Sequence, residues 1–120
     1  MPTRAILVED SAAIRATLIP AVRELADVQV IACAETVTEA LSASDNHEWH
    51  LMILDMFLRE GSGLTVLDRL RHRSPLQRIV VLTNYATADM RERCTQLGAN
   101  AVFDKSTELD EFFDDCARIH

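Results

Sequence analysis

The stretch LMILDMFL (residues 51–58) contains seven apolar side chains and one aspartate, Asp55. Its first four residues form a continuous apolar run, which is typical of a strand covered on both faces in a parallel sheet. A buried carboxylate is costly unless a partner meets it. Asp55 therefore either leaves the core at this point or is met by a cation from elsewhere in the chain.

Four further short apolar runs divide the chain in the same way, at residues 5–8, 28–33, 79–82 and 101–103. Between the runs, apolar residues recur at three- and four-residue steps, as in residues 14–25, 63–73 and 90–97, which favours helices. Strand and helix thus alternate five times. Right-handed crossovers then predict an α/β fold, (βα)5, with a doubly wound parallel five-stranded sheet.

Size and charge limit the classes of protein that fit. With 120 residues, 48% of them hydrophobic, the chain suits one domain over residues 1–120. Lysine and arginine number 12 against 19 aspartates and glutamates, a formal charge of -7, and the basic residues are not concentrated in one stretch. Direct binding to nucleic acid or to an anionic membrane surface is therefore disfavoured.

The cysteines and the apolar runs indicate a cytoplasmic protein. Cys33, Cys94 and Cys116 are odd in number and lack the paired spacing of metal sites, which favours reduced thiols. No apolar run approaches the length of a signal peptide core or a membrane span.

Polar side chains follow or end four of the five predicted strands. These are Glu9 and Asp10, Asp55, Thr83 and Lys105. Ligands of open α/β sheets bind at the carboxyl ends of the strands, so we expect these five side chains to lie together. Three adjacent carboxylates repel one another unless a divalent cation holds them ionised.

Carboxylate ligands favour Mg²⁺ or Mn²⁺ over zinc, which prefers nitrogen and sulfur. A hydroxyl and an ammonium on the other side of such a cation would hold an anion. A nucleophile, charge neutralisation and positioning are what phosphoryl transfer needs. The strand ends therefore indicate phosphoryl chemistry.

At these residues the chain resembles the CheY-like receiver domain of bacterial two-component response regulators, over residues 4–118. The matching pattern is VED at 8–10, LD at 54–55 with Gly63 eight positions later, LT at 82–83, and Lys105 after the fifth strand. The resemblance implies a flavodoxin-like fold with strand order 2-1-3-4-5. It also implies transfer of a phosphoryl group from the phosphohistidine of a sensor histidine kinase or phosphotransfer protein.

The resemblance assigns a role to each matching residue. Asp55 would be the phosphoacceptor, and Mg²⁺ would be held by Asp10, Asp55 and the backbone carbonyl of Phe57, with Glu9 reaching it through water. The protein would catalyse only its own phosphorylation and dephosphorylation. Its product would be a changed surface that binds a downstream protein, or an effector domain missing from this sequence.

Two further residues would sense the phosphoryl group. Lys105 would pair with the acceptor carboxylate and then with the phosphoryl oxygens, and Thr83 would hydrogen-bond one of those oxygens and so report phosphorylation. Receivers usually carry Tyr or Phe three residues before the lysine, as part of this switch. The chain has Val102 there, and we expect Phe103 to face the opposite side of the sheet. Whether the family's aromatic switch operates is left open.

Alternatives remain at each level. Taken singly, each strand-end residue has a structural explanation, such as acidic groups favoured before a helix. A receiver fold that binds partners without phosphorylation is the second hypothesis. A haloacid-dehalogenase-type phosphatase is the third, but it would need a second aspartate two residues after Asp55, where Phe57 stands.

Other clusters fit structural roles better. HEWH (47–50) precedes the third strand, at the sheet end opposite the site, and we expect a loop with an amphipathic Trp49 and no metal. RLRHR (69–73) suits a helix C-terminus, where cations complement the dipole.

Overall fold

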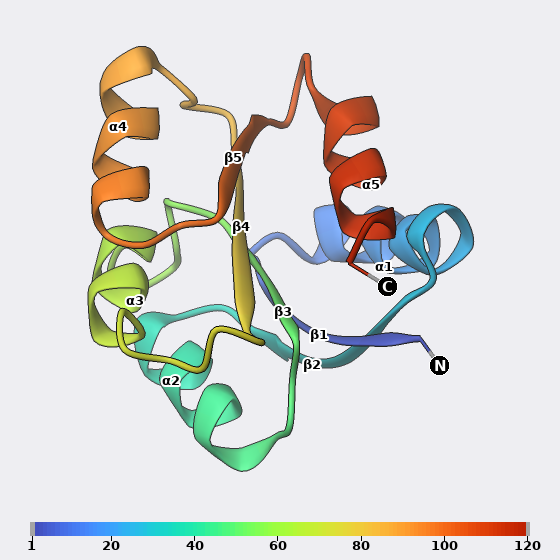
Figure 1. The fold of residues 1–120 in the computed structure, drawn as a ribbon, viewed down its shortest axis with the longest axis horizontal. Coiled ribbons are helices and arrows are strands. Elements are labelled where there is room, and N and C mark those ends of the chain that lie inside the picture. Colours follow the sequence, from blue (N-terminus) through green and yellow to red (C-terminus); the bar gives the residue numbers. More distant parts are fainter. Residues whose placement is uncertain (1, 120) are drawn as a thin grey trace.

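The computed structural model describes residues 2–119. Five strands alternate with five helices, as the apolar pattern predicted (Figure 1). In chain order the elements are β1 (Thr3–Val8), α1 (Ala12–Ala26), β2 (Val28–Ala34), α2 (Val37–Asn46), β3 (Leu51–Leu54), α3 (Gly63–Arg69), β4 (Arg78–Thr83), α4 (Ala88–Gln96), β5 (Ala101–Asp104) and α5 (Leu109–Ala117).

The strands form one sheet in the order β2-β1-β3-β4-β5, with every neighbouring pair parallel. Helices α1 and α5 cover one face, and α2, α3 and α4 cover the other (Figure 1). The predicted flavodoxin-like arrangement is confirmed. All five carboxyl ends of the strands therefore meet at one edge.

Each face of the sheet has its own core. Alternate strand residues supply the two cores, so Ile6 and Met52 pack toward α2 and α3 while Leu7 and Ile53 pack toward α1 and α5. Continuous apolar runs in the sequence are the consequence of burial on both faces.

The alternation extends to β5. Val102 packs against the core beneath α2, α3 and α4, whereas Phe103 packs on the other side, with its ring centroid 6.1 Å from that of Phe112. The expectation that Phe103 faces away from Val102 is confirmed. At position 102, the α4 side of β5 therefore carries a valine side chain instead of an aromatic ring.

HEWH forms a loop, as expected, in which Trp49 is buried in the core while its indole N–H donates to the Ser44 hydroxyl at 3.2 Å. One local prediction was wrong. Helix α3 ends at Arg69, four residues short of the helical pattern. The guanidinium of Arg73 donates instead to the backbone carbonyls of Leu70, Gln77 and Gly98, joining the loop after α3 to the end of α4.

All three cysteines are free thiols. Burial raises the pKa of Cys94, and it raises the pKa of Cys116 to about 12, so both remain protonated and unreactive at neutral pH. Among residues 2–119, no helix combines the length and hydropathy that a membrane span requires.

Candidate phosphoacceptor and metal site

Backbone pairing between neighbouring strands sets the positions of the site residues. The amide of Glu9 donates to the carbonyl of Ala34, and the amide of Asp55 donates to the carbonyl of Val8. On the other side, the amide of Lys105 donates to the carbonyl of Thr83 at 3.0 Å. Neighbouring strands thus hold these residues at the carboxyl edge.

Lys105 reaches across this edge to two carboxylates. Its ammonium lies 2.5 Å from Oε1 of Glu9 and 3.2 Å from Oδ2 of Asp55. The contact with Asp55 is the one the family resemblance implied. Glu9 is a closer partner that the sequence did not indicate.

The third carboxylate completes an acidic cluster. One carboxylate oxygen from each of Glu9, Asp10 and Asp55 lies within 4.8 Å of the others. Lys105 supplies a single positive charge to this cluster of three acids. When all three are ionised, the site carries an excess of negative charge.

Burial shifts the pKa of the groups at the centre. Desolvation raises the pKa of Asp55 and that of Glu9 above their ordinary values, although the ammonium of Lys105 acts in the opposite direction on both. Desolvation alone would lower the pKa of Lys105, but its hydrogen bond to Glu9 and the charges of Asp55 and Glu9 raise it overall. Lys105 is therefore charged at neutral pH.

The donor set fits a hard divalent cation. In octahedral coordination with ligands at about 2.1 Å, opposite oxygens lie about 4.2 Å apart, so carboxylate oxygens within 4.8 Å need only a small adjustment. A divalent charge would also offset the excess negative charge of the cluster. The residues present thus suit Mg²⁺ in chemistry and in spacing.

Thr83 and two aromatic rings lie along the next strand ends. Thr83 is fully buried, and its hydroxyl accepts a hydrogen bond from the amide of Tyr85 at 3.2 Å. The rings of Phe57 and Tyr85 have centroids 4.5 Å apart and are more than half exposed. These rings form an apolar rim on the loops that follow Asp55 and Thr83.

Gly63, which the sequence pattern singled out, keeps the loop after Asp55 in place. Its amide donates to the carbonyl of Met56 at 2.8 Å. A Cβ at this position would lie 2.4 Å from the carbonyl oxygen of Asp55 and 3.0 Å from Cα of Met56. A side chain here would push the acceptor loop away, which explains the glycine.

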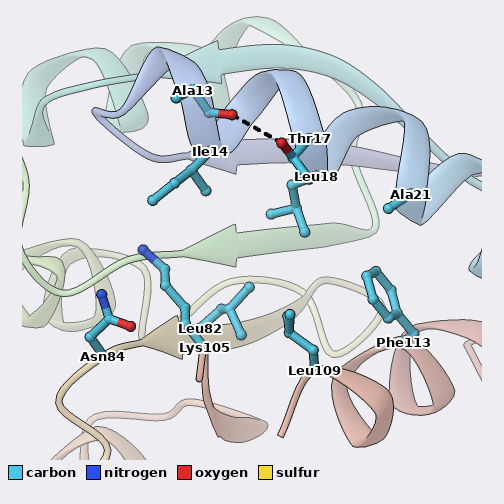
Figure 2. Close-up of a pocket in the computed structure, with 10 residues that line it drawn as sticks. All are labelled: Ala13, Ile14, Thr17, Leu18, Ala21, Leu82, Asn84, Lys105, Leu109 and Phe113. Atoms are coloured by element: carbon cyan, nitrogen blue, oxygen red, sulfur yellow. Dashed lines mark hydrogen bonds between the residues drawn. The ribbon is translucent and has the colours of Figure 1, made fainter. Parts of the chain in front are cut away.

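A cleft of about 450 Å³ between α1 and α5 leads to the site. Figure 2 shows Asn84 and Lys105 together at one end and Phe113 at the other. The side chains between them are almost all apolar; they are Ala13, Ile14, Leu18, Ala21, Leu82 and Leu109, with Thr17 among them. The stem of Lys105 is therefore shared between the charged site and an apolar surface.

One supporting residue was missed by the sequence analysis. Arg15 donates to the backbone carbonyl of Glu9 at 2.6 Å and to the carboxylate of Glu35 at 3.3 Å. It lies on the first helix, four residues after the N-cap Ser11. An arginine in a helical run carries no signal of this kind in sequence, because its acceptor is a backbone carbonyl.

Comparisons with known proteins agree with this geometry. The family model described as the response regulator receiver domain matches residues 5–116. Protein-glutamate methylesterase/protein-glutamine glutaminase 1 of Rhodospirillum rubrum is 29% identical over 112 residues, 92% of this chain and 29% of that protein. The photosynthetic apparatus regulatory protein RegA of Rhodobacter capsulatus is 32% identical over 78 residues, 65% of this chain and 42% of RegA. The chain spans less than half the length of these relatives.

Solved structures show the same fold. A two-component response regulator of the LuxR family from Aurantimonas sp. SI85-9A1 superposes with a TM-score of 0.89 at 19% identity, covering 99% of this chain and 85% of that chain. The response regulator domain of Thermotoga maritima CheB gives 0.83 at 18% identity, covering 100% and 99%. At this level of identity the likeness concerns the fold alone.

The excess of buried negative charge predicts that Asp55→Asn stabilises the protein in the absence of divalent cations. Because the folded-state pKa of Asp55 is raised, its ionised form opposes folding above the unfolded-state pKa. We expect a gain on the order of 1 kcal/mol in unfolding free energy at pH 7, lost below about pH 4, where Asp55 is protonated in both states. Urea titrations with a chelator measure this.

The exposed Asp45→Asn is the matched control and should change stability little. Added Mg²⁺ should stabilise the wild type more than Asp55→Asn. A variant less stable than the wild type at pH 7 without divalent cations would contradict this electrostatic interpretation.

Proposed function

Because the chain belongs to the response regulator receiver domain family, we propose that it accepts a phosphoryl group on Asp55 in a Mg²⁺-dependent reaction and thereby changes its partner-binding surface. Receiver domains act in two-component signalling, and this chain is one of them. We also propose that residues 1–120 form one such domain.

One observation carries the assignment of Asp55. Its carboxylate lies 3.2 Å from the ammonium of Lys105 and belongs to the same cluster as the carboxylates of Glu9 and Asp10. Glu9 also meets both the lysine and the proposed metal, and the family pattern around Asp55, with Gly63 eight positions later, is what favours Asp55 as the acceptor. A nucleophilic carboxylate needs both to accept a highly charged phosphoryl group.

The proposed reaction is a displacement at phosphorus. A carboxylate oxygen of Asp55 attacks the phosphorus of a phosphohistidine that is protonated on its other ring nitrogen, the P–O bond forms, the P–N bond breaks with its electron pair passing to the ring, and neutral imidazole leaves. The ammonium of Lys105, now on Glu9 and Asp55, turns to a phosphoryl oxygen. The hydroxyl of Thr83 donates to another oxygen and releases the amide of Tyr85.

Four residues would hold the metal. Asp10, Asp55 and the backbone carbonyl of Phe57 would ligate Mg²⁺, and Glu9 would reach it through water. When bound, the ion supplies positive charge to the phosphoryl oxygens. Glu9, released by Lys105 at that stage, would be available to orient a ligand water.

The other readings have less support. A multiple-turnover phosphatase lacks its second aspartate, because Phe57 occupies that position with a ring more than half exposed. We therefore propose that catalysis is limited to the protein's own phosphorylation and dephosphorylation. A pseudo-receiver is favoured by Val102 and by Asn84 after Thr83, two residues that depart from the family pattern.

The proposed partners follow from the surfaces around the site. We place the phosphodonor, a sensor histidine kinase or phosphotransfer protein, against the apolar cleft between α1 and α5, because that cleft ends at Lys105. The output would be a downstream protein or an effector domain on a longer chain, without direct nucleic-acid binding by this domain. The cytoplasmic location stays a prediction.

The phosphoacceptor assignment predicts that acetyl phosphate with Mg²⁺ adds one phosphoryl group to the wild type and none to Asp55→Asn. The reaction should stop when a chelator removes Mg²⁺, because the acidic cluster then repels the anionic donor. Intact-mass spectrometry measures both results. A wild type that gains no phosphoryl group would favour the pseudo-receiver, and a variant that gains one would refute Asp55 as the acceptor.

The aromatic rim should lengthen the lifetime of the phosphorylated state. Phe57 and Tyr85 exclude water from the approach to Asp55, so Phe57→Asn should shorten the half-life of the phosphoryl group several-fold. Decay of the phosphorylated protein after removal of the donor gives this half-life. Leu25→Asn, which alters an equally exposed apolar residue on α1, serves as the control. An unchanged half-life in Phe57→Asn would refute the shielding role.

A further inference from the structure

A single arginine on α4 connects the loop after Thr83 with β5 and α5. Nε of Arg91 donates to the carbonyl of Ala86 at 2.9 Å, and its Nη1 donates to the carbonyl of Val102 at 3.0 Å. Its Nη2 forms an ion pair with the carboxylate of Glu108. One planar guanidinium therefore joins three segments of the chain, a geometry for which its fixed set of donors is suited.

Glu108 connects this ion pair to the other side of the site. The oxygen that accepts from Arg91 also accepts from the amide of Asp104 at 2.9 Å. Asp104 is the residue directly before Lys105. Movement of Lys105 toward a phosphoryl group would therefore act on the backbone that Glu108 holds.

The loop after β4 connects the pair to Thr83. The hydroxyl of Thr83 accepts from the amide of Tyr85 at 3.2 Å, and the amide of Thr87 donates to the carbonyl of Tyr85 at 2.9 Å. Ala86, the acceptor for Arg91, lies between these two anchored residues. If the Thr83 hydroxyl turns to a phosphoryl oxygen, the loop loses its first anchor.

We propose that Arg91, through its hydrogen bonds to Ala86, Val102 and Glu108, is the positioning residue that couples the phosphorylation site to the surface of α4, β5 and α5. The proposal rests on the proposed function of Asp55. Val102 has no ring to move. Arg91 instead contacts the carbonyl of Ala86, the residue after Tyr85, and Glu108 accepts from the amide of Asp104, the residue before Lys105. Phosphorylation weakens two hydrogen bonds, the one from Arg91 to the Ala86 carbonyl and the one from the Asp104 amide to Glu108.

The test uses beryllium trifluoride with Mg²⁺ as the phosphoryl mimic and follows backbone amides by NMR. In the wild type, the amide of Asp104 should exchange with solvent about fivefold faster once the mimic binds, the scale of one lost hydrogen bond. In Arg91→Met this amide should exchange fast already, and the mimic should change it little. Shifts of the amides of Asp55 and Met56 report binding of the mimic in both proteins.

Two further variants make the outcome decisive. Arg93→Met removes an exposed arginine from the same helix and should respond as the wild type does. Glu108→Met removes the acceptor of both Arg91 and the Asp104 amide, so this amide should exchange fast with or without the mimic, as in Arg91→Met, which guards against misfolding of one variant. An Arg91→Met protein that keeps the full wild-type response would overturn the proposal.

Failure of the proposal and failure of the proposed function give different results. If the mimic shifts the amides beside Asp55 in the wild type but leaves the Asp104 amide unchanged, the coupling role is wrong while the phosphoacceptor role stands. If the mimic does not bind at Asp55 in the wild type, both are wrong.

Discussion

An excess of buried negative charge at the carboxyl edge of the sheet is the feature on which the candidate site depends. One ammonium, that of Lys105, serves the carboxylates of Glu9 and Asp55, with Asp10 in the same cluster. The site therefore favours any ligand that brings positive charge, and a divalent cation with all-oxygen ligands suits it. Once such a cation is present, Lys105 is free to hold an anion on Asp55. The same imbalance thus opposes stability in the free protein and prepares it for phosphoryl transfer.

The parallel sheet is what brings these groups together. Lys105 and Glu9 are 96 residues apart in sequence, and their side chains meet because β1 and β5 end at the same edge. Because both faces of the sheet are buried, polar side chains are accommodated at its carboxyl edge. Gly63 then allows the loop after Asp55 to lie against α3 without a clash. The fold therefore fixes the distances on which the chemistry depends.

The sequence was informative where a structural feature depends on the order of residues along the chain. Continuous apolar runs indicated buried strands, and strand ends indicated the residues of the site. It was uninformative where partners depend on side-chain reach, so the closer contact of Lys105 with Glu9 was not anticipated. Nor did the sequence indicate the acceptor of the Trp49 indole, the Ser44 hydroxyl, because this pair forms only in the folded chain. The role proposed for Arg91 leaves no pattern, since two of its acceptors are backbone carbonyls.

A crystal structure with Mg²⁺ and beryllium trifluoride tests the phosphoacceptor site most directly. The beryllium should bond to a carboxylate oxygen of Asp55, with its fluorines within hydrogen-bond reach of Nζ of Lys105 and Oγ1 of Thr83. The metal should lie on Asp10, Asp55 and the carbonyl of Phe57. A fluoride complex bound elsewhere, or Lys105 still on Glu9 with Thr83 still accepting from Tyr85, would contradict the assignment of this site.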